Sequence, residues 1–156
     1  MLSVAVPGYA TLQLEHLVLD YNGTLACDGA LIDGVCERLE RLAQDLRIHV
    51  VTADTFGKAR QALAGLPCQL QVLPAGNQEQ AKLVYIQLLG CERVVAIGNG
   101  RNDRLMLEAA ALGIAVVQRE GAAAETLRAA DAVCPSILDA LDLLASPLRL
   151  VATLRT

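Results

Sequence analysis

A carboxylate at the end of a short apolar run is the residue of this chain best placed for chemistry. Asp20 ends the run His16–Asp20, and the turn-forming residues Asn22 and Gly23 follow at once. A carboxylate beside a turn rich in backbone N–H groups can act as a nucleophile toward an electrophile such as phosphorus. Asp, Asn and Gly are also ordinary turn residues, so this segment alone leaves a purely structural role open.

Three later positions carry the groups that a carboxylate nucleophile needs in order to attack a phosphate. An anionic nucleophile approaches an anionic phosphate only if cations neutralise the charge. Thr52 offers a hydroxyl donor, Lys82 offers a positive charge, and the segment Gly98–Asp103 gathers amide and carboxylate groups. Taken singly, these residues could end a strand, sit in solvent or cap a helix. Their order at predicted strand ends favours a phosphoryl-transfer site.

The same positions could hold a magnesium ion. Mg²⁺ prefers hard oxygen ligands in octahedral geometry and keeps several waters. Asp20 can supply a carboxylate oxygen, Asn22 its backbone carbonyl, and Asn99 or Asp103 a side-chain oxygen from the opposite side. Mg²⁺ is therefore the expected cofactor.

Alternating strands and helices must position these residues. The expected strands are short apolar runs typical of strands buried on both faces: His16–Asp20, Ile48–Thr52, Gln69–Leu73, Arg93–Ile97, Gly113–Val117 and Ala132–Cys134. The expected helices lie between them: Asp33–Leu46, Thr55–Leu66, Asn77–Leu89, Asn102–Leu112, Ala122–Ala130 and Ser136–Leu144. This β-α-β order implies right-handed crossovers and a doubly wound, three-layer α/β/α fold with a parallel sheet. Ligands of such a sheet bind at the carboxyl ends of its strands.

Two smaller features complete the expected fold. Asn77 is the expected cap of its helix, with Gln80 three residues later in a capping-box-like pair. Thr11–Glu15 alternates polar and apolar residues, so it could pair as an extra edge strand. A length of 156 residues fits one domain over residues 1–156, with a core at about 16–144, an extension at 1–10 and a terminal segment at 147–156.

Composition narrows the classes of partner. The net charge is −4 and only four residues are aromatic, so neither a basic patch nor a stacking platform for nucleic acid is present. No apolar run approaches the ~20 residues that span a bilayer, and the N-terminus lacks the positive charge of a signal peptide. Five cysteines without a C-x-x-C pair indicate reduced thiols. We expect a cytoplasmic protein that binds neither nucleic acid nor membrane.

The four segments together resemble the motifs of the haloacid dehalogenase superfamily. Asp20–Leu25 is similar to its first motif, Asp-x-Asp-Gly-Thr, and Val50–Thr52 to its second. Lys82 stands where the third-motif lysine belongs, and Gly98–Asp103 resembles the fourth, Gly-Asp-Gly-x-Asn-Asp. Gly98–Val117 most resembles the phosphorylation domain of P-type ATPases, a likeness that small stand-alone phosphatases share.

The resemblance implies a Rossmann-like sheet of strand order 3-2-1-4-5 and a phosphatase that forms an aspartyl-phosphate on Asp20. The catalytic residues would be Asp20, Asn22, Thr52 and Lys82, and the metal ligands Asp20, Asn22, Asn99 and Asp103. The phosphate would lie against Gly23, Thr24, Thr52, Ala53, Lys82 and Asn102. Tyr21–Ile32 and Pro74–Gln78 are too short for a folded cap, so an open site is expected. The substrate would be a phosphorylated small molecule or a phosphoprotein, and a second copy of the chain could cover the site.

Two departures from the family pattern affect the expected activity. The general acid of the family's phosphatases, two residues after the nucleophile, is replaced by Asn22, whose amide does not exchange a proton near neutral pH. General acid–base help is worth roughly 10²–10⁴-fold, so slow turnover is expected. Asn99 replaces a metal-binding Asp and removes one negative charge.

The same departures leave open a second function, in which a degenerate site binds a phosphorylated ligand or a protein partner. A two-component receiver domain also combines Asp, Thr and Lys around Mg²⁺. In receivers the acceptor Asp ends the third strand, whereas here the good nucleophile ends the first, so this alternative is disfavoured. The strand residues His16 and His49 lie toward the opposite edge of the predicted sheet and receive no catalytic role.

Overall fold

Six parallel strands form the central sheet of the computed structural model, which describes residues 1–54 and 57–156. Across the sheet the order is β10-β9-β8-β3-β6-β7. The strands are β3 (His16–Asp20), β6 (Arg47–Thr52), β7 (Cys68–Val72), β8 (Val94–Gly98), β9 (Leu112–Val116) and β10 (Ala132–Cys134). Counted along the chain from β3, this arrangement reads 3-2-1-4-5, with a sixth strand beyond the fifth. Because every neighbouring pair is parallel, the carboxyl ends of all six strands lie at one edge.

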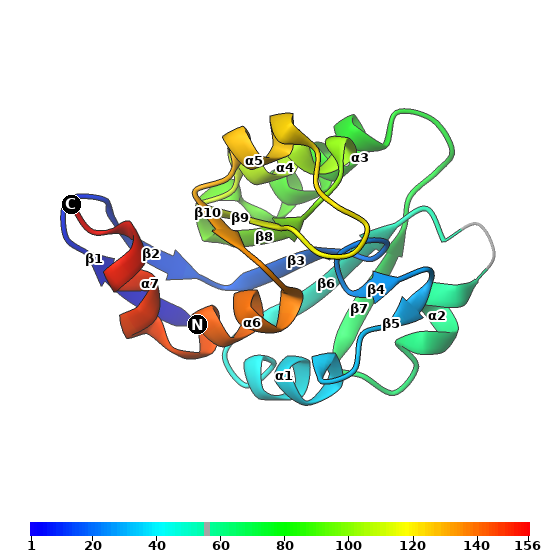
Figure 1. Cartoon of the computed structure of the whole chain (residues 1–156), viewed down its shortest axis with the longest axis horizontal. Helices are drawn as coiled ribbons and strands as arrows, with labels where there is room; N and C mark the ends of the chain where they lie inside the picture. Colours follow the sequence, from blue (N-terminus) through cyan, green and yellow to red (C-terminus); the bar gives the residue numbers. More distant parts are fainter. Residues whose placement is uncertain (55–56) are drawn as a thin grey trace.

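Helices cover both faces of this sheet (Figure 1). One face carries α3 (Gln78–Leu89), α4 (Arg104–Ala109) and α5 (Ala124–Ala129). The other carries α1 (Val35–Leu42), α2 (Lys58–Ala62) and α6 (Ile137–Ala145). Short 3₁₀ turns, η1 (Cys91–Arg93) and η2 (Arg101–Asp103), precede β8 and α4. The predicted α/β doubly wound, three-layer fold is confirmed.

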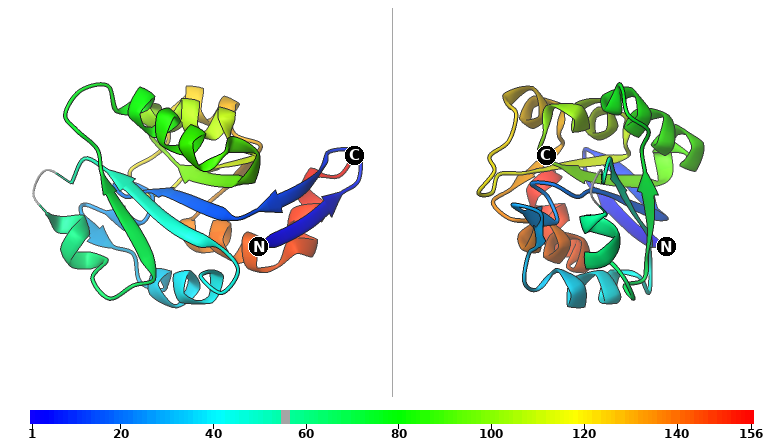
Figure 2. Two further views of the ribbon diagram at one scale, coloured as in Figure 1. Left: turned by 180° about the vertical axis from the view of Figure 1, so that it is seen from behind. Right: turned by 90° about the vertical axis from the view of Figure 1, so that its right-hand side faces the viewer.

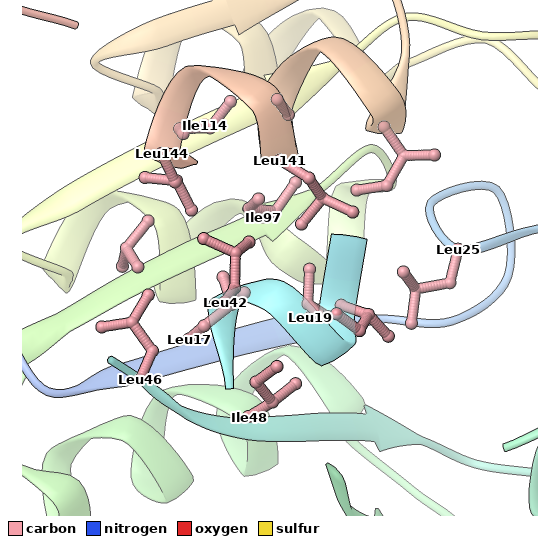
Figure 3. Packing of buried hydrophobic residues seen from close by; sticks show 14 of the residues in the cluster. Leu17, Leu19, Leu25, Leu42, Leu46, Ile48, Ile97, Ile114, Leu141 and Leu144 are labelled. Atoms are coloured by element: carbon pink, nitrogen blue, oxygen red, sulfur yellow. The ribbon is translucent and has the colours of Figure 1, made fainter. Parts of the chain in front are cut away.

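On the four inner strands β3, β6, β8 and β9, alternate side chains belong to two separate cores. On β3, Leu17 and Leu19 pack with α1 and α6, whereas Val18 packs on the opposite face with Ile86 of α3. Figure 3 shows the first of these cores, where leucines of α1 and α6 meet the strand residues. Burial on both faces is what the continuous apolar runs of the sequence indicate.

A hairpin and a final helix form an extension at one end of the sheet (Figure 2). The strand expected at Thr11–Glu15 is β2 (Ala10–Leu14), and it does not join the main sheet as an edge strand. It pairs antiparallel with β1 (Leu2–Val6) in a separate two-stranded sheet. Only alternate residues such as Val4 and Leu12 are buried. Because each strand of this hairpin buries one face only, an apolar element must pack against that face. α7 (Pro147–Leu154) lies against β1 and contributes the buried Leu150.

Several predicted helices are shorter than expected. Gly34 (φ +88°) and Gly57 (φ +70°) adopt left-handed conformations, so α1 and α2 begin only after them, at Val35 and Lys58. The expected start at Thr55 lies outside the described residues. α4 ends at Ala109, and β9 begins three residues later at Leu112. Gly113 permits the close approach of β9 to α4, because a Cβ there would lie 2.3 Å from the Leu107 carbonyl oxygen.

No cap domain is found among residues 1–54 and 57–156. Between the first motif and α1 there is only a small hairpin, formed by β4 (Ala26–Cys27) and β5 (Ala30–Leu31). In the described part of the chain, no helix is long and apolar enough to cross a membrane.

Candidate active site

A buried lysine bridges two buried carboxylates at the carboxyl edge of the sheet. Lys82 of α3 places its Nζ 2.7 Å from Asp20 Oδ1 and 2.7 Å from Asp103 Oδ1. Asp20 ends β3, and Asp103 belongs to the turn that follows β8, so the fold brings together residues 83 positions apart in the sequence. All three side chains are nearly inaccessible to solvent. The sequence prediction that these residues share one site is consistent with this geometry.

When both carboxylates are ionised, this cluster carries one surplus negative charge. Burial first, and then repulsion from Asp103, raises the pKa of Asp20 to about 7 against the opposing effect of Lys82. Burial by itself lowers the pKa of Lys82, but the attraction of Asp20 and Asp103 outweighs this and raises it. Two carboxylates held against one ammonium therefore form a site that favours an added cation.

Thr24 and Asn99 indicate where that cation would bind. The Thr24 hydroxyl lies 3.3 Å from Asp20 Oδ2 and 3.2 Å from Asn99 Oδ1, and its single proton can serve only one of these acceptors. Asn99 Nδ2 donates to the Gly121 carbonyl at 3.0 Å, which turns the amide oxygen toward Thr24. Hard oxygen atoms therefore converge here, and they fit the ligand preference of Mg²⁺.

The structure gives Asp103 a different setting from the metal ligand expected. Its Oδ1 accepts from Lys82, and its Oδ2 accepts from the backbone N–H groups of Asn99 and Gly100 at 3.0 and 2.9 Å. Both oxygens are thus used to orient the lysine and the loop. Gly98 makes room for this arrangement, because a Cβ there would lie 2.5 Å from Asp103 Cγ.

A hollow of approximately 390 Å³ opens beside Asp20. Its lining residues are Asp20, Asn22, Thr52, Ala53, Gln78, Gly100, Arg101 and Asn102. The Thr52 hydroxyl accepts from the Asp54 N–H at 3.3 Å, and it donates to no group within residues 1–54 and 57–156. The Asn102 amide oxygen accepts from Lys82 at 3.3 Å. The hollow therefore joins the nucleophile to several of the residues expected at a phosphate.

Gly23 and Thr24 shape the site in a different way from that expected. The Gly23 N–H donates to the Ala26 carbonyl and the Thr24 N–H to the Tyr21 carbonyl, so these groups already have partners within the turn. Gly23 has φ +79°, and a Cβ there would lie 2.4 Å from Asn99 Nδ2. These two residues support the site through the tight turn and the Thr24 hydroxyl.

Two residues near the site were missed by the sequence analysis. The buried Thr126 donates from its hydroxyl to the Gly100 carbonyl at 2.7 Å and braces the loop after β8. Gln118 donates to the carbonyl groups of Gly23 and Thr24. Neither belongs to a motif, and their contacts arise between segments distant in sequence, so no local signal points to them.

Other polar residues lie apart from this cluster. Asp54 accepts from the Ala59 and Arg60 N–H groups, so it serves the first turn of α2. His16 Nδ1 lies 3.0 Å from His49 Nε2, near the opposite end of β3. All five cysteines are free.

Comparison with known proteins agrees with this geometry. A family model described as haloacid dehalogenase-like hydrolase matches residues 79–139. An uncharacterized protein of Methanocaldococcus jannaschii, MJ0073, is 45% identical over 84 residues, which cover 51% of this chain and 90% of that protein.

Two solved structures share the fold at low sequence identity. One is the 3-deoxy-D-manno-octulosonate 8-phosphate phosphatase of Moraxella catarrhalis, in complex with magnesium, phosphate and the sugar (TM-score 0.71, 14% identity). The match covers 86% of this chain and 87% of the phosphatase. The other is a zinc-transporting PIB-type ATPase (TM-score 0.62, 21% identity), matched over 78% of this chain and 20% of the ATPase. With its four motifs gathered at one sheet edge, the chain belongs to the haloacid dehalogenase-like hydrolases.

Proposed function

We propose that this protein is a Mg²⁺-dependent phosphohydrolase that forms an aspartyl-phosphate on Asp20. The observation that carries the proposal is the Lys82 ammonium, 2.7 Å from each of the Asp20 and Asp103 carboxylates, where Asp20 itself lines a hollow together with Thr52. Such an arrangement holds an anionic nucleophile ready and supplies the positive charge that a phosphate needs.

In the first step, an Asp20 carboxylate oxygen attacks phosphorus. The Asp20–phosphorus bond forms as the bond from phosphorus to the leaving-group oxygen breaks. Asp20 Oδ1 accepts from Lys82 at 2.7 Å, and Oδ2 has a longer contact of 3.3 Å with the Thr24 hydroxyl. The Thr52 hydroxyl can donate to a phosphate oxygen, and Lys82 offsets charge at the nucleophile.

The residues that would hold the magnesium ion are Asp20 through its carboxylate, Asn22 through its backbone carbonyl and Asn99 through its amide oxygen. When bound, the ion supplies positive charge that neutralises the phosphate and the nucleophile. Asp103 remains the fourth proposed ligand: its Oδ2 holds the loop after β8, while its Oδ1 accepts from Lys82 and keeps a second lone pair.

Asn22 sets the expected rate and the choice of substrate. Its exposed side chain lines the hollow but can neither protonate a leaving group nor deprotonate water. Substrates whose leaving groups depart without a proton, such as acyl and aryl phosphates, should therefore react best. In the second step water attacks the phosphorus of the aspartyl-phosphate, releases inorganic phosphate and restores Asp20. Without a base this step is slow.

The physiological substrate would be a phosphorylated small molecule or a phosphoprotein. The fold neighbour from Moraxella catarrhalis acts on a phosphorylated sugar acid, which supports the first of these classes. The proposed cytoplasmic location and a covering second copy of the chain stay predictions.

Hydrolysis of an aryl phosphate and of acetyl phosphate in Mg²⁺ tests the proposal. Wild type should turn both over slowly, Asp20→Asn should be inactive, and removal of Mg²⁺ by a chelator should abolish turnover. Activity that persists in Asp20→Asn would contradict the proposal.

A second candidate function is a non-catalytic module that binds a phosphorylated ligand or a protein. Asn22 and Asn99, at the positions of the family's acid and metal-binding Asp, favour it. Metal or inorganic phosphate binding without Asp20-dependent turnover of any acyl or aryl phosphate, together with a specific partner, would favour this module.

A further inference from the structure

The side chain of Gln118 connects the turn after the nucleophile to the start of α6. Its Nε2 donates to the carbonyl oxygens of Gly23 and Thr24 at 3.1 and 2.9 Å. Its Oε1 accepts from the Ile137 N–H at 2.8 Å. Gln118 follows β9 closely in sequence, so one amide links three segments that are far apart in the chain.

The two carbonyl groups held by Gln118 belong to the turn that positions Asp20. Three N–H groups of this turn have partners within it, from Gly23 to the Ala26 carbonyl and from Thr24 and Ala26 to the Tyr21 carbonyl. The carbonyl groups of Gly23 and Thr24 have no partner within the turn, and within residues 1–54 and 57–156 only Gln118 donates to them. The carbonyl groups of Gly23 and Thr24 thus depend on this one side chain for their hydrogen bonds.

Thr24 transmits the position of the turn to the reacting group. Its hydroxyl contacts Asp20 Oδ2 at 3.3 Å and Asn99 Oδ1 at 3.2 Å, so a displaced Thr24 would release both oxygens. The Asn22 carbonyl, proposed as a metal ligand, is part of the same turn. A shift of about 1 Å in such a group can reduce a rate by about 10²-fold.

We propose that Gln118 is a positioning residue, which holds the turn Tyr21–Ala26 in the geometry that phosphoryl transfer to Asp20 requires. The proposal rests on the proposed function. Gln118 itself does not line the hollow beside Asp20 and lies outside the reacting groups.

Gln118→Glu is the most informative variant, because it keeps the shape and the acceptor for the Ile137 N–H but removes both donors to the turn. The matched control is Ser136→Ala, which removes the side-chain cap of α6 (Ser136 Oγ to the Asp139 N–H, 3.0 Å) without touching the turn. If Gln118 acted only by stabilising α6, Ser136→Ala would reproduce its effects. Gln118→Ala tests loss of the whole link.

Two readouts separate positioning from general stability. Because the second step limits turnover of acetyl phosphate, the first readout is the single-turnover rate at which Asp20 gains the phosphoryl group, and this rate should fall about 10- to 100-fold in Gln118→Glu and Gln118→Ala. Amide hydrogen exchange in residues 21–26 should rise in both variants. In Ser136→Ala neither quantity should change, although its melting temperature falls.

Unchanged exchange in residues 21–26, or equal losses of the Asp20 phosphorylation rate in Ser136→Ala and Gln118→Glu, would overturn the proposal. If wild type shows no Asp20-dependent turnover, the proposed function fails, whereas the exchange measurement still decides whether Gln118 holds the turn. Normal exchange there would then reject the positioning role on its own.

Discussion

Asp20 and His16 lie at the two ends of one face of β3, and their buried polar partners are arranged in different ways. Near the amino end, His16 Nδ1 contacts His49 Nε2 at 3.0 Å, and His49 Nδ1 contacts the Tyr85 hydroxyl at 2.9 Å. At the carboxyl end, Lys82 bridges Asp20 and Asp103. Tyr85 and Lys82 are both on α3, three positions apart, so β3 and α3 each contribute a residue to both groups.

The two groups differ in charge balance. The histidine–tyrosine chain can satisfy all its inner contacts with neutral groups, and burial together with nearby His16 lowers the pKa of His49 to about 4. The carboxylate cluster sets two acids against one ammonium, and the Thr24 hydroxyl proton cannot serve both oxygens that face it. A buried polar cluster whose members satisfy one another's hydrogen bonds indicates a structural role. A cluster with more acidic than basic groups indicates a site that binds a cation.

Removal of the lysine should give the largest effect. Lys82→Met leaves two buried carboxylates without a counter-charge, which costs about 3–5 kcal/mol when one partner of a buried pair is lost. Turnover should also fall by at least about 10²–10³-fold. Urea unfolding and acetyl phosphate hydrolysis measure the two effects.

Tyr85→Phe is the matched control on the same helix. It removes one hydrogen bond to His49 and should cost about 1 kcal/mol of stability with turnover unchanged. If Tyr85→Phe reduced turnover as strongly as Lys82→Met, the division into a structural and a functional group would be wrong.

Restoring the missing acid should produce the next largest effect. Asn22→Asp should raise hydrolysis of substrates with poor leaving groups, such as sugar phosphates, by about 10²-fold or more, because the carboxyl group can donate and accept a proton. Asn22→Asp should accelerate the first step with acetyl phosphate less, because the leaving group of an acyl phosphate departs without a proton. No gain with either substrate would indicate that Asn22 is not placed beside the leaving group.

A substitution at Gly98 tests whether the close packing around Asp103 matters for turnover. Gly98→Ala puts a methyl group 2.5 Å from Asp103 Cγ, so the carboxylate must move away from Lys82 and the Asn99 N–H. We expect turnover to fall about 10-fold or more with a destabilisation of about 1–3 kcal/mol. Gly65→Ala is the control away from the site: its φ of +83° makes the substitution destabilising, but a Cβ there meets nothing within 4 Å and turnover should not change. Equal turnover in both variants would contradict the packing argument.

The smallest effect concerns pH. Since the folded pKa of His49 is lowered from 6.5 to about 4, its neutral form stabilises the fold fully above pH 6.5. That stabilisation is lost progressively as pH falls from 6.5 toward about 4. The charged neighbours of the pair are Glu15, Arg47 and Arg93, and burial likewise lowers the pKa of His16.

Unfolding free energies measured across this pH range should therefore decline for wild type and decline less for His49→Gln, which cannot take up a proton. An equal slope in both proteins would show that the histidine pair does not govern acid sensitivity. His49→Gln should retain turnover at neutral pH, as expected of the structural group.

The sequence predicted the sheet and its edge well because strong apolar periodicity fixes strands that are buried on both faces. β3 and β10 have the predicted bounds, and Asn77 caps α3 through the Gln80 N–H at 3.1 Å, as expected. The placement of Asp20, Lys82 and Asp103 in one cluster follows from the strand order.

Contacts between distant segments could not be predicted in this way. The hairpin of β1 and β2 depends on the cover that α7 supplies, which the alternation at residues 11–15 does not reveal. Likewise the His49–Tyr85 contact joins a strand to a helix, and the Gln118 amide joins three segments. Local propensity carries no information about such pairings.

The central claim is that Asp20 accepts a phosphoryl group, and trapping that group tests it most directly. Protein incubated with acetyl phosphate and Mg²⁺, then quenched in acid, should gain the mass of one phosphoryl group by intact mass spectrometry. Peptide mapping should locate it on Asp20, and Asp20→Asn should remain unmodified. The slow second step expected with Asn22 should make the adduct accumulate, and Asn22→Asp should accumulate less. An unmodified wild-type protein, or a phosphoryl group on another residue, would contradict the account.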